Sequence, residues 1–440
     1  MHKVGLMAPK TRLLPSHPPV MGYYERSVLE MVSLIHGLEA DPWTAGDKCL
    51  CVQMKLLEKT RHVENKIRAT KANIKRTRDV LGKQTSPVLG KIRARDAKKA
   101  LLTFHSKLDG YRRVLHILKD IGDALAFMYI DKYDIKPMRF KEASGFISGK
   151  TGLRKELLQL RRVFKLGGIG ILNDLTHCLR YGDITVGYRG RMLATVEVKS
   201  GRKRDQRGMR QSIGIAKIAN YLRTDQTHDL YGIDGEFHRF AVKGVEVNHR
   251  NRLDVLIRQA RKYGLSWEEV ENGQFYVVVY ENNLGWMNSI NQRCKGKPMW
   301  TIINELKWQN LAYYPFTLSF HDPTALWEFY IGKMLVISVI DTKVLEEHFI
   351  AQRLRGELLE EEDFALRVLD LGGQADGPLA AEHKVSRQFF HRLSAEFLGL
   401  EWMCYQICSL RLAATEASRR AATSRTSQIA RPEESNNLGV

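Results

Sequence analysis

Apolar residues recur at helical spacing through two long segments near the start of the chain. Over residues 50–82 they alternate with threonines at steps of three and four residues, which is the pattern of an amphipathic helix in a short coiled coil. Residues 101–118 repeat the spacing, and the glycines and the Ser-Pro pair between the two segments favour a turn. The pattern predicts an antiparallel helical hairpin over residues 48–120, after a lead-in over residues 1–47.

A second pattern, short apolar runs separated by turn residues, follows further along the chain. Residues 183–186 and 192–198 are typical of two strands, and the Gly-Tyr-Arg-Gly sequence between them is typical of a turn. The hairpin so predicted folds Asp183 back beside Glu197. Because side chains alternate between the two faces of a strand, Glu197 and Lys199 project to the same side.

These three residue types in this arrangement indicate metal-dependent hydrolysis of a phosphodiester. Carboxylate oxygens of Asp183 and Glu197 are the ligands that Mg²⁺ prefers, with waters and a substrate phosphate completing its octahedron. The ammonium of Lys199 can orient or activate a metal-bound water, or neutralise charge that builds up at the scissile phosphate. We therefore expect a hydrolytic centre at this edge of the sheet.

The succession of Asp183, a short hairpin and Glu197-x-Lys199 resembles the core of the PD-(D/E)XK nuclease superfamily, which includes type II restriction enzymes and archaeal Holliday junction resolvases. The resemblance covers about residues 112–223, with Gly182 where the superfamily has its proline. It implies an α/β fold, a mixed sheet flanked by helices in a restriction-endonuclease-like core.

The resemblance also implies a cofactor and further site residues. It implies Mg²⁺, with Mn²⁺ as a substitute, and the carbonyl oxygen of Val198 as a ligand. Many of these nucleases carry an acid on the helix before the hairpin. Asp123 matches it, since a carboxylate among apolar residues needs a metal or a cationic partner; Asp120 is the alternative. Gln211, on the basic helix after the hairpin, would contact nucleic acid or orient the lysine.

Two further motifs of known function have only partial counterparts near these residues. Residues 144–151, SGFISGKT, resemble a phosphate-binding loop, but Ser144 replaces the required glycine and no buried strand leads into the loop. Nucleotide hydrolysis is therefore rejected. The Gln-x-x-x-Tyr motif of RecB-like nucleases is missing, because neither Gln206 nor Gln211 has a tyrosine four residues on.

The remainder of the chain continues the alternation of strands and helices. The nuclease core is predicted over residues 112–285, and its sheet is predicted to gain strands from residues 237–247 and 274–280. Residues 286–413 are predicted as an accessory α/β to mainly helical C-terminal domain, with a helix over residues 354–371. The polar residues 414–440 are predicted to be a disordered tail.

The charge composition of the chain indicates which kind of molecule it binds. The 440-residue chain has a formal net charge of +20, and residues 55–119 alone contain 19 Lys and Arg against 5 Asp and Glu. Such single-signed charge favours contact with a phosphate backbone through the basic arm (residues 55–119) and through the basic helix over residues 202–223. A membrane surface is the rival partner, and the threonines of the helical seam count against it.

Cysteine usage and the N-terminus bear on the compartment. The six cysteines lack zinc-site spacing, and the N-terminal segment has no continuous apolar run. We expect a cytoplasmic protein that does not bind membranes.

The sequence thus predicts a Mg²⁺-dependent endodeoxyribonuclease, with antiviral defence against foreign DNA as a further expectation. It also predicts self-association through the helical arm. Two alternatives stay open: a non-catalytic nucleic-acid-binding or assembly protein on a nuclease-like fold, and an RNA nuclease.

Overall fold

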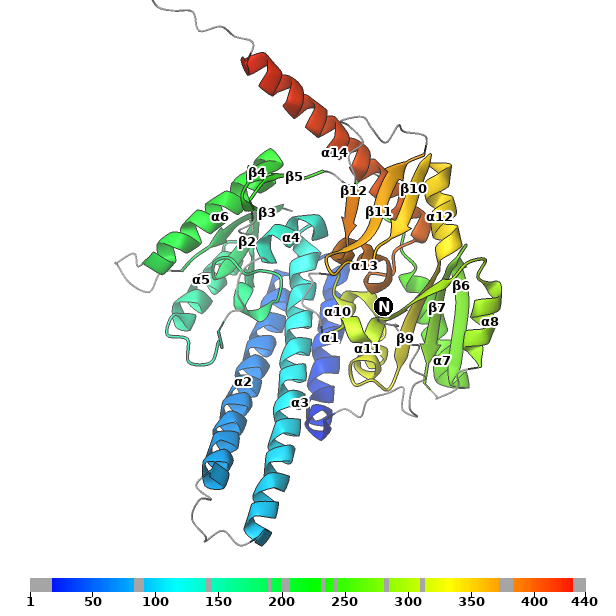
Figure 1. Cartoon of the computed structure of the whole chain (residues 1–440). Helices are drawn as coiled ribbons and strands as arrows, with labels where there is room; N and C mark the ends of the chain where they lie inside the picture. The colour runs from blue at the N-terminus through cyan, green and yellow to red at the C-terminus, as the bar shows by residue number, and fades with distance from the viewer. Residues whose placement is uncertain are drawn as a thin grey trace, which may run out of the picture.

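The described part of the chain, in a computed structural model, forms a long helical hairpin, four small antiparallel sheets and further helices (Figure 1). The residues that the structure describes are 18–82, 91–139, 145–188, 191–198, 206–230, 234–240, 242, 244–280, 285–308, 313–371 and 383–429.

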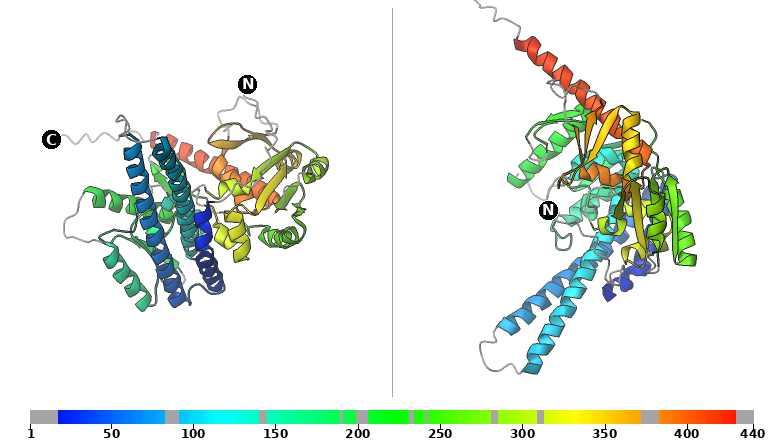
Figure 2. Two further views of the ribbon diagram at one scale, coloured as in Figure 1. Left: turned by 90° about the horizontal axis from the view of Figure 1, so that it is seen from below. Right: turned by 45° about the vertical axis from the view of Figure 1, so that its right-hand side comes forward.

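The predicted helical arm is present. Helix α1 (Glu25–Glu39) packs against the base of a hairpin formed by α2 (Gly46–Gly82) and α3 (Lys91–Tyr129). The two long helices run side by side and project from the body of the protein (Figures 1 and 2). Near the body their apolar stripes are fully buried, as at Leu56 and Val114, whereas Leu102 in the projecting part is 73% exposed. The arm is therefore anchored at its base and solvated along its outer half.

The predicted β-hairpin is also present, in a small sheet of its own. The chain passes from α5 (Leu153–Lys165) through β1 (Ile169–Leu172) and the short helix η2 (Asn173–Leu175) to β2 (Ile184–Tyr188). Strand β3 (Arg191–Val196) and helix α6 (Gln206–Thr224) follow. The strand order is β1-β2-β3, and each neighbouring pair is antiparallel.

The strand over residues 274–280 does not extend this sheet, and that prediction was wrong. It forms β7 (Gln274–Val279), which pairs with β6 (Leu265–Glu271) and β9 (Leu335–Asp341) in a separate sheet completed by β8 (Pro298–Ile302). All six residues of β7 are buried, so the apolar run was a sound strand signal. Pairing partners, however, are set by tertiary packing, which no local pattern encodes.

Two predictions for the C-terminal region need correction. Residues 354–371 form strands β10 (Leu354–Leu358) and β11 (Phe364–Asp370) rather than a helix, and they pair with β12 (His383–Ser386). Helix α14 (Leu400–Ile429) continues well past residue 413, so residues 414–429 are helical and not a disordered tail. Residues 430–440 lie outside the described residues.

The other elements connect these units. Helix α7 (Arg250–Tyr263) ends at Gly264, which has φ +82°. Among the described residues of the strand predicted over residues 237–247, the structure has β5 (Glu236–His238), which pairs with β4 (Gln226–His228). The remaining helices are η1 (Pro19–Tyr24), α4 (Lys132–Arg139), α8 (Trp286–Arg293), α9 (Ile303–Leu306), α10 (Phe316–Ser319), α11 (Pro323–Tyr330), α12 (Thr342–Ala351) and α13 (Arg387–Ala395).

Among the contacts between the base of the arm and the small sheet, one glycine allows an especially close approach. At Gly122 of α3, an added Cβ would collide with the backbone carbonyl oxygen of Leu175 in η2. This close approach brings the loop between β1 and β2, which carries several polar residues, directly against the helix.

We expect Gly122→Ala to lower the free energy of unfolding by about 1–3 kcal/mol, because the helix and the η2 backbone must separate to admit the methyl group. The matched control is Gly37→Ala in α1, where no atom lies within 4 Å of the added carbon. That change should stabilise by up to about 1 kcal/mol through helix propensity. Urea unfolding followed by circular dichroism measures both, and equal effects of the two changes would contradict the close approach.

Candidate functional site

Asp183 lies at the entrance to the β-hairpin and contacts the end of its second strand. Its backbone N–H donates to the carbonyl of Val196 at 2.9 Å, and its Oδ2 accepts a hydrogen bond from the N–H of Val198 at 2.8 Å. Glu197 is the residue between these two partners. The structure therefore brings Asp183 to the Glu197-Val198 peptide, as the hairpin pattern predicts.

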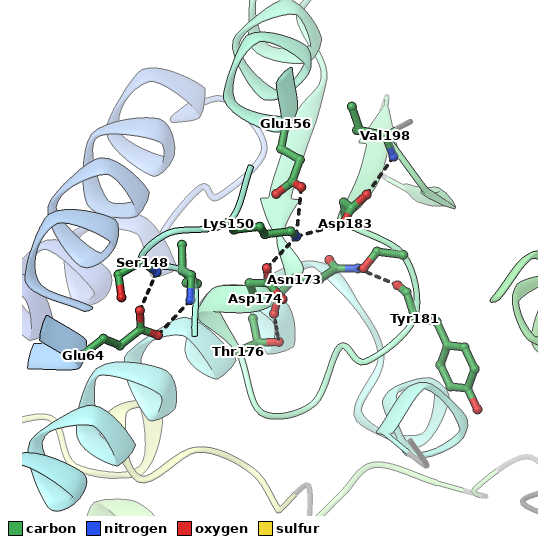
Figure 3. A network of polar contacts seen from close by, with 12 residues as sticks. Glu64, Ser148, Lys150, Glu156, Asn173, Asp174, Thr176, Tyr181, Asp183 and Val198 are labelled. Atoms are coloured by element: carbon green, nitrogen blue, oxygen red, sulfur yellow. Dashed lines mark hydrogen bonds and ion pairs between the residues drawn. The ribbon is translucent and has the colours of Figure 1, made fainter. Parts of the chain in front are cut away.

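The ammonium of Lys150 lies at the centre of three carboxylates (Figure 3). Its Nζ is 2.8 Å from Asp174 Oδ2, 2.9 Å from Glu156 Oε1 and 3.0 Å from Asp183 Oδ1. Burial alone would lower the pKa of Lys150, but the three carboxylates raise it above its ordinary value. Lys150 is thus held as a cation. We call these four residues the Lys150 cluster.

Each member of the Lys150 cluster comes from a different segment. Glu156 lies in the first turn of α5, Asp174 in η2, Asp183 just before β2, and Lys150 in the loop before α5. The side chain of Glu156 is only 2% exposed, whereas those of Asp174 and Asp183 are 16% and 17% exposed. Burial raises the pKa of Glu156, and the neighbouring Asp183 adds to this effect.

The side chain of Asn173 fixes the loop that carries Asp174. Its Nδ2 donates to the carbonyl of Tyr181 at 2.7 Å, and its Oδ1 accepts from the hydroxyl of Thr185 at 2.8 Å. The Asn173 N–H also donates to the carbonyl of Asp183 at 3.0 Å. Asn173 and Asp174 are the first residues of η2, and these hydrogen bonds hold Asp174 beside Asp183.

Lys150 is positioned by the motif that resembles a phosphate-binding loop. The N–H groups of Ile147 and Ser148 donate to the two oxygens of Glu64 in α2, at 3.0 and 2.6 Å. Glu64 is 1% exposed. Gly149, with φ +85°, turns the chain so that Lys150 points to the carboxylates. Amides that would face a phosphate therefore face a buried carboxylate of the same chain.

Asp123 and Asp120 have other partners. Asp123 Oδ1 accepts from the N–H groups of His177 and Cys178 at 2.6 and 3.0 Å, and Oδ2 lies 3.0 Å from the His177 ring. Burial would raise the pKa of Asp123, but His177 lowers it below its ordinary value. Asp120 instead accepts from the N–H and the hydroxyl of Thr317. Glu156, and not Asp123, shares a cationic partner with Asp183. The role expected for Asp123 stays a prediction.

Two predicted residues are not located by the structure. Lys199 lies outside the described residues. Gln211 belongs to α6, but the position of its side chain is not among the features that the structure describes. Their roles stay predictions.

The oxygen donors of the Lys150 cluster suit a hard divalent cation in kind. Within the described ranges, however, no group of three or more His, Cys, Asp or Glu residues is arranged to hold a metal ion. In the Lys150 cluster, Lys150 Nζ lies 2.8–3.0 Å from one oxygen of each of the three carboxylates. A Mg²⁺ ion in the place of Nζ would need the carboxylate oxygens at about 2.1 Å. The donors fit Mg²⁺ chemically, and the ammonium occupies their centre.

Sequence reasoning missed Glu156, Asp174 and Lys150. A signal for Glu156 was available, since it begins an amphipathic helix that directly precedes β1. Lys150 was set aside with the rejected loop motif, and no local pattern links it to residues 174 and 183.

Comparisons with protein-family models, with curated proteins and with solved structures find no match to this chain. None of the helices in the described part of the chain combines the length and the apolar character needed to cross a membrane.

A pair of histidines lies beside Asp123, and the burial of His116 makes the stability of the fold depend on pH. The ring centroids of His116 and His177 are 4.4 Å apart. Burial, together with the neighbouring His177, lowers the pKa of His116 to about 3. The unfolded chain therefore binds a proton at His116 between about pH 6.5 and 3 that the folded chain does not. Above this pH window, His116 does not reduce the free energy of unfolding. As the pH falls through the window, His116 lowers the free energy of unfolding.

We expect His116→Gln to reduce the slope of the free energy of unfolding against pH by about 1.4 kcal/mol per pH unit within that window. Urea unfolding at several pH values between 4 and 7 measures the slope. His62→Gln, at an exposed position of α2, makes the same chemical change elsewhere, and its slope is measured for comparison. A His116 variant with the wild-type slope would contradict the assignment.

Proposed function

We propose that this protein is a metal-dependent nuclease that hydrolyses phosphodiester bonds of DNA. One observation carries the proposal: the carboxylate of Asp183 accepts a hydrogen bond from the N–H of Val198, the residue between Glu197 and Lys199. If Asp183 and Glu197 lay far apart, they could not share one metal ion. Glu156 adds a third carboxylate through Lys150.

The order of elements supports the same class. A helix, three strands and a second helix follow one another as α5, β1, β2, β3 and α6, with the middle strand antiparallel to both neighbours. This succession resembles the PD-(D/E)XK core. On this proposal Glu156, on the helix before the strands, has the part that sequence reasoning gave to Asp123. The remaining sheets form accessory units.

The chemistry follows from the donors. Asp183, Glu197, the carbonyl of Val198 and Glu156 would hold Mg²⁺, or Mn²⁺ as a substitute. A bound ion of this kind polarises the phosphate and lowers the pKa of a coordinated water. Lys199, two residues after Glu197 in the sequence, would orient that water or neutralise charge on the phosphate. Gln211 would contact the DNA from α6.

The basic arm supports DNA as the substrate class. Exposed cations follow α2 outward from the body, among them Arg61, Lys66, Lys71, Lys75 and Arg78. At 1.5 Å per residue the 37-residue helix is about 55 Å long, enough to follow more than one turn of a duplex. Binding through phosphates makes the affinity fall steeply with salt. Self-association through the arm remains a further proposal.

A non-catalytic DNA-binding role is the second candidate, and the Lys150 cluster favours it. An ammonium already neutralises part of the acidic charge there, so the acids have a structural use without a metal. The two candidates differ in one respect that can be measured, which is cleavage.

We expect the wild-type protein to cleave plasmid DNA in Mg²⁺ or Mn²⁺ and not in chelator. Asp183→Asn and Glu197→Gln should lower the rate about 100-fold or more, since each removes a group that places charge at the reacting phosphate. Lys199→Ala should do the same. Single-stranded RNA at equal phosphate concentration, offered in a parallel assay, should be cleaved more slowly.

The matched controls are Asp79→Asn and Glu58→Gln, which change exposed acids of α2 by the same chemistry. Both should cleave like the wild type. Salt-dependent DNA binding without cleavage in any divalent ion would favour the non-catalytic candidate, and faster cleavage of RNA would favour an RNA nuclease.

A further inference from the structure

The three carboxylates of the Lys150 cluster resemble the ligands of a metal ion, but the cation among them is the ammonium of a lysine side chain. Three carboxylate oxygens surround one nitrogen at 2.8, 2.9 and 3.0 Å, and they come from Asp174, Glu156 and Asp183. An ordinary surface ion pair joins one cation to one acid. Here a single ammonium neutralises one of three acidic charges, so the cluster keeps a net negative charge.

Glu156 shows that the cluster has a further ligand to offer. Its Oε1 contacts Lys150, but its Oε2 is buried and accepts no hydrogen bond from any described residue. A buried carboxylate oxygen without a donor costs free energy in a purely structural site. It is the arrangement expected of an oxygen that can bind a cation.

The position of Lys150 is set from outside the cluster. Glu64 holds the N–H groups of Ile147 and Ser148, and Arg68 donates to the carbonyl of Ser148. The loop is therefore fixed on α2 independently of the carboxylates. Removing the Lys150 side chain would therefore leave the contacts between the loop and α2 in place.

We propose that Lys150 is the resident cation of a divalent-metal position formed by Glu156, Asp174 and Asp183, and that it excludes an ion from that position. This rests on the proposed function, because Asp183 and Glu156 also belong to the catalytic centre proposed above. The active protein then uses one divalent ion, at Asp183, Glu197 and Glu156, with the Lys150 ammonium as the neighbouring positive charge. Lys150 acts through these carboxylates and is a positioning residue.

The consequence is specific. A neutral side chain of similar length, as in Lys150→Met, leaves three acids facing one another with no cation between them. Their mutual repulsion then favours binding of a divalent ion, which supplies two positive charges where the lysine supplied one. A lysine that served only as a structural ion pair would leave a weakened protein with no new affinity for metal.

The experiment counts bound Mn²⁺ by electron paramagnetic resonance of the free ion, at fixed protein concentration and without nucleic acid. We expect Lys150→Met to bind one more Mn²⁺ per chain than the wild type. Lys150→Arg should keep the wild-type count because it keeps the charge. Lys165→Ala, at an exposed position of α5, removes the same charge elsewhere and should also keep that count.

The double variant Lys150→Met/Asp174→Asn identifies the position, because the extra ion should be lost when one of its ligands is neutralised. If Lys150→Met is unfolded in chelator, the proposal predicts that Mn²⁺ restores its circular dichroism spectrum. An unchanged ion count in a folded Lys150→Met, or a variant that stays unfolded at every Mn²⁺ concentration, would overturn the proposal.

The outcome is separable from that of the nuclease proposal. A wild-type protein that neither binds an ion nor cleaves DNA would remove the proposed function. An extra ion in Lys150→Met that depends on Asp174 would still support the resident-cation role.

Discussion

The attraction between one ammonium and three poorly solvated carboxylates governs the arrangement of the candidate site. Acids gathered from α5, η2 and the start of β2 would repel one another, and burial makes their ionised forms more costly. Lys150 offsets part of this cost at 2.8–3.0 Å from each acid. Its cation allows segments far apart in the chain to converge beside the β-hairpin. The same charge decides whether the acids have room for a metal ion.

Buried carboxylates of the arm form the frame around this cluster. Glu64 on α2 binds the loop that presents Lys150, and Asp123 on α3 binds the backbone of His177 and Cys178. Asp120, one turn away, binds Thr317 and so attaches α10. The helical hairpin thus has two separate regions. Its outer half is basic and solvated, whereas its base uses acids to hold loops of the body in place.

What the sequence could predict follows from the range of the interactions involved. The helices of the arm and the β-hairpin arise from local periodicity, and a hairpin is itself local, so the approach of Asp183 to Glu197 was predictable. The burial of Asp123 was also predicted correctly, but its partner His177 was not, because that contact joins α3 to a distant loop. Glu156 and Lys150 reach Asp183 only through tertiary packing.

The central claim is that acids at the mouth of the hairpin bind a divalent cation. Crystals grown with Mn²⁺ and measured at its absorption edge test it most directly. The account predicts an anomalous peak within ~2.5 Å of a carboxylate oxygen of Asp183, on the side of Glu197, with Lys150 still among its three acids. Crystals that contain Mn²⁺ elsewhere, or none, with no peak at Asp183 would contradict it.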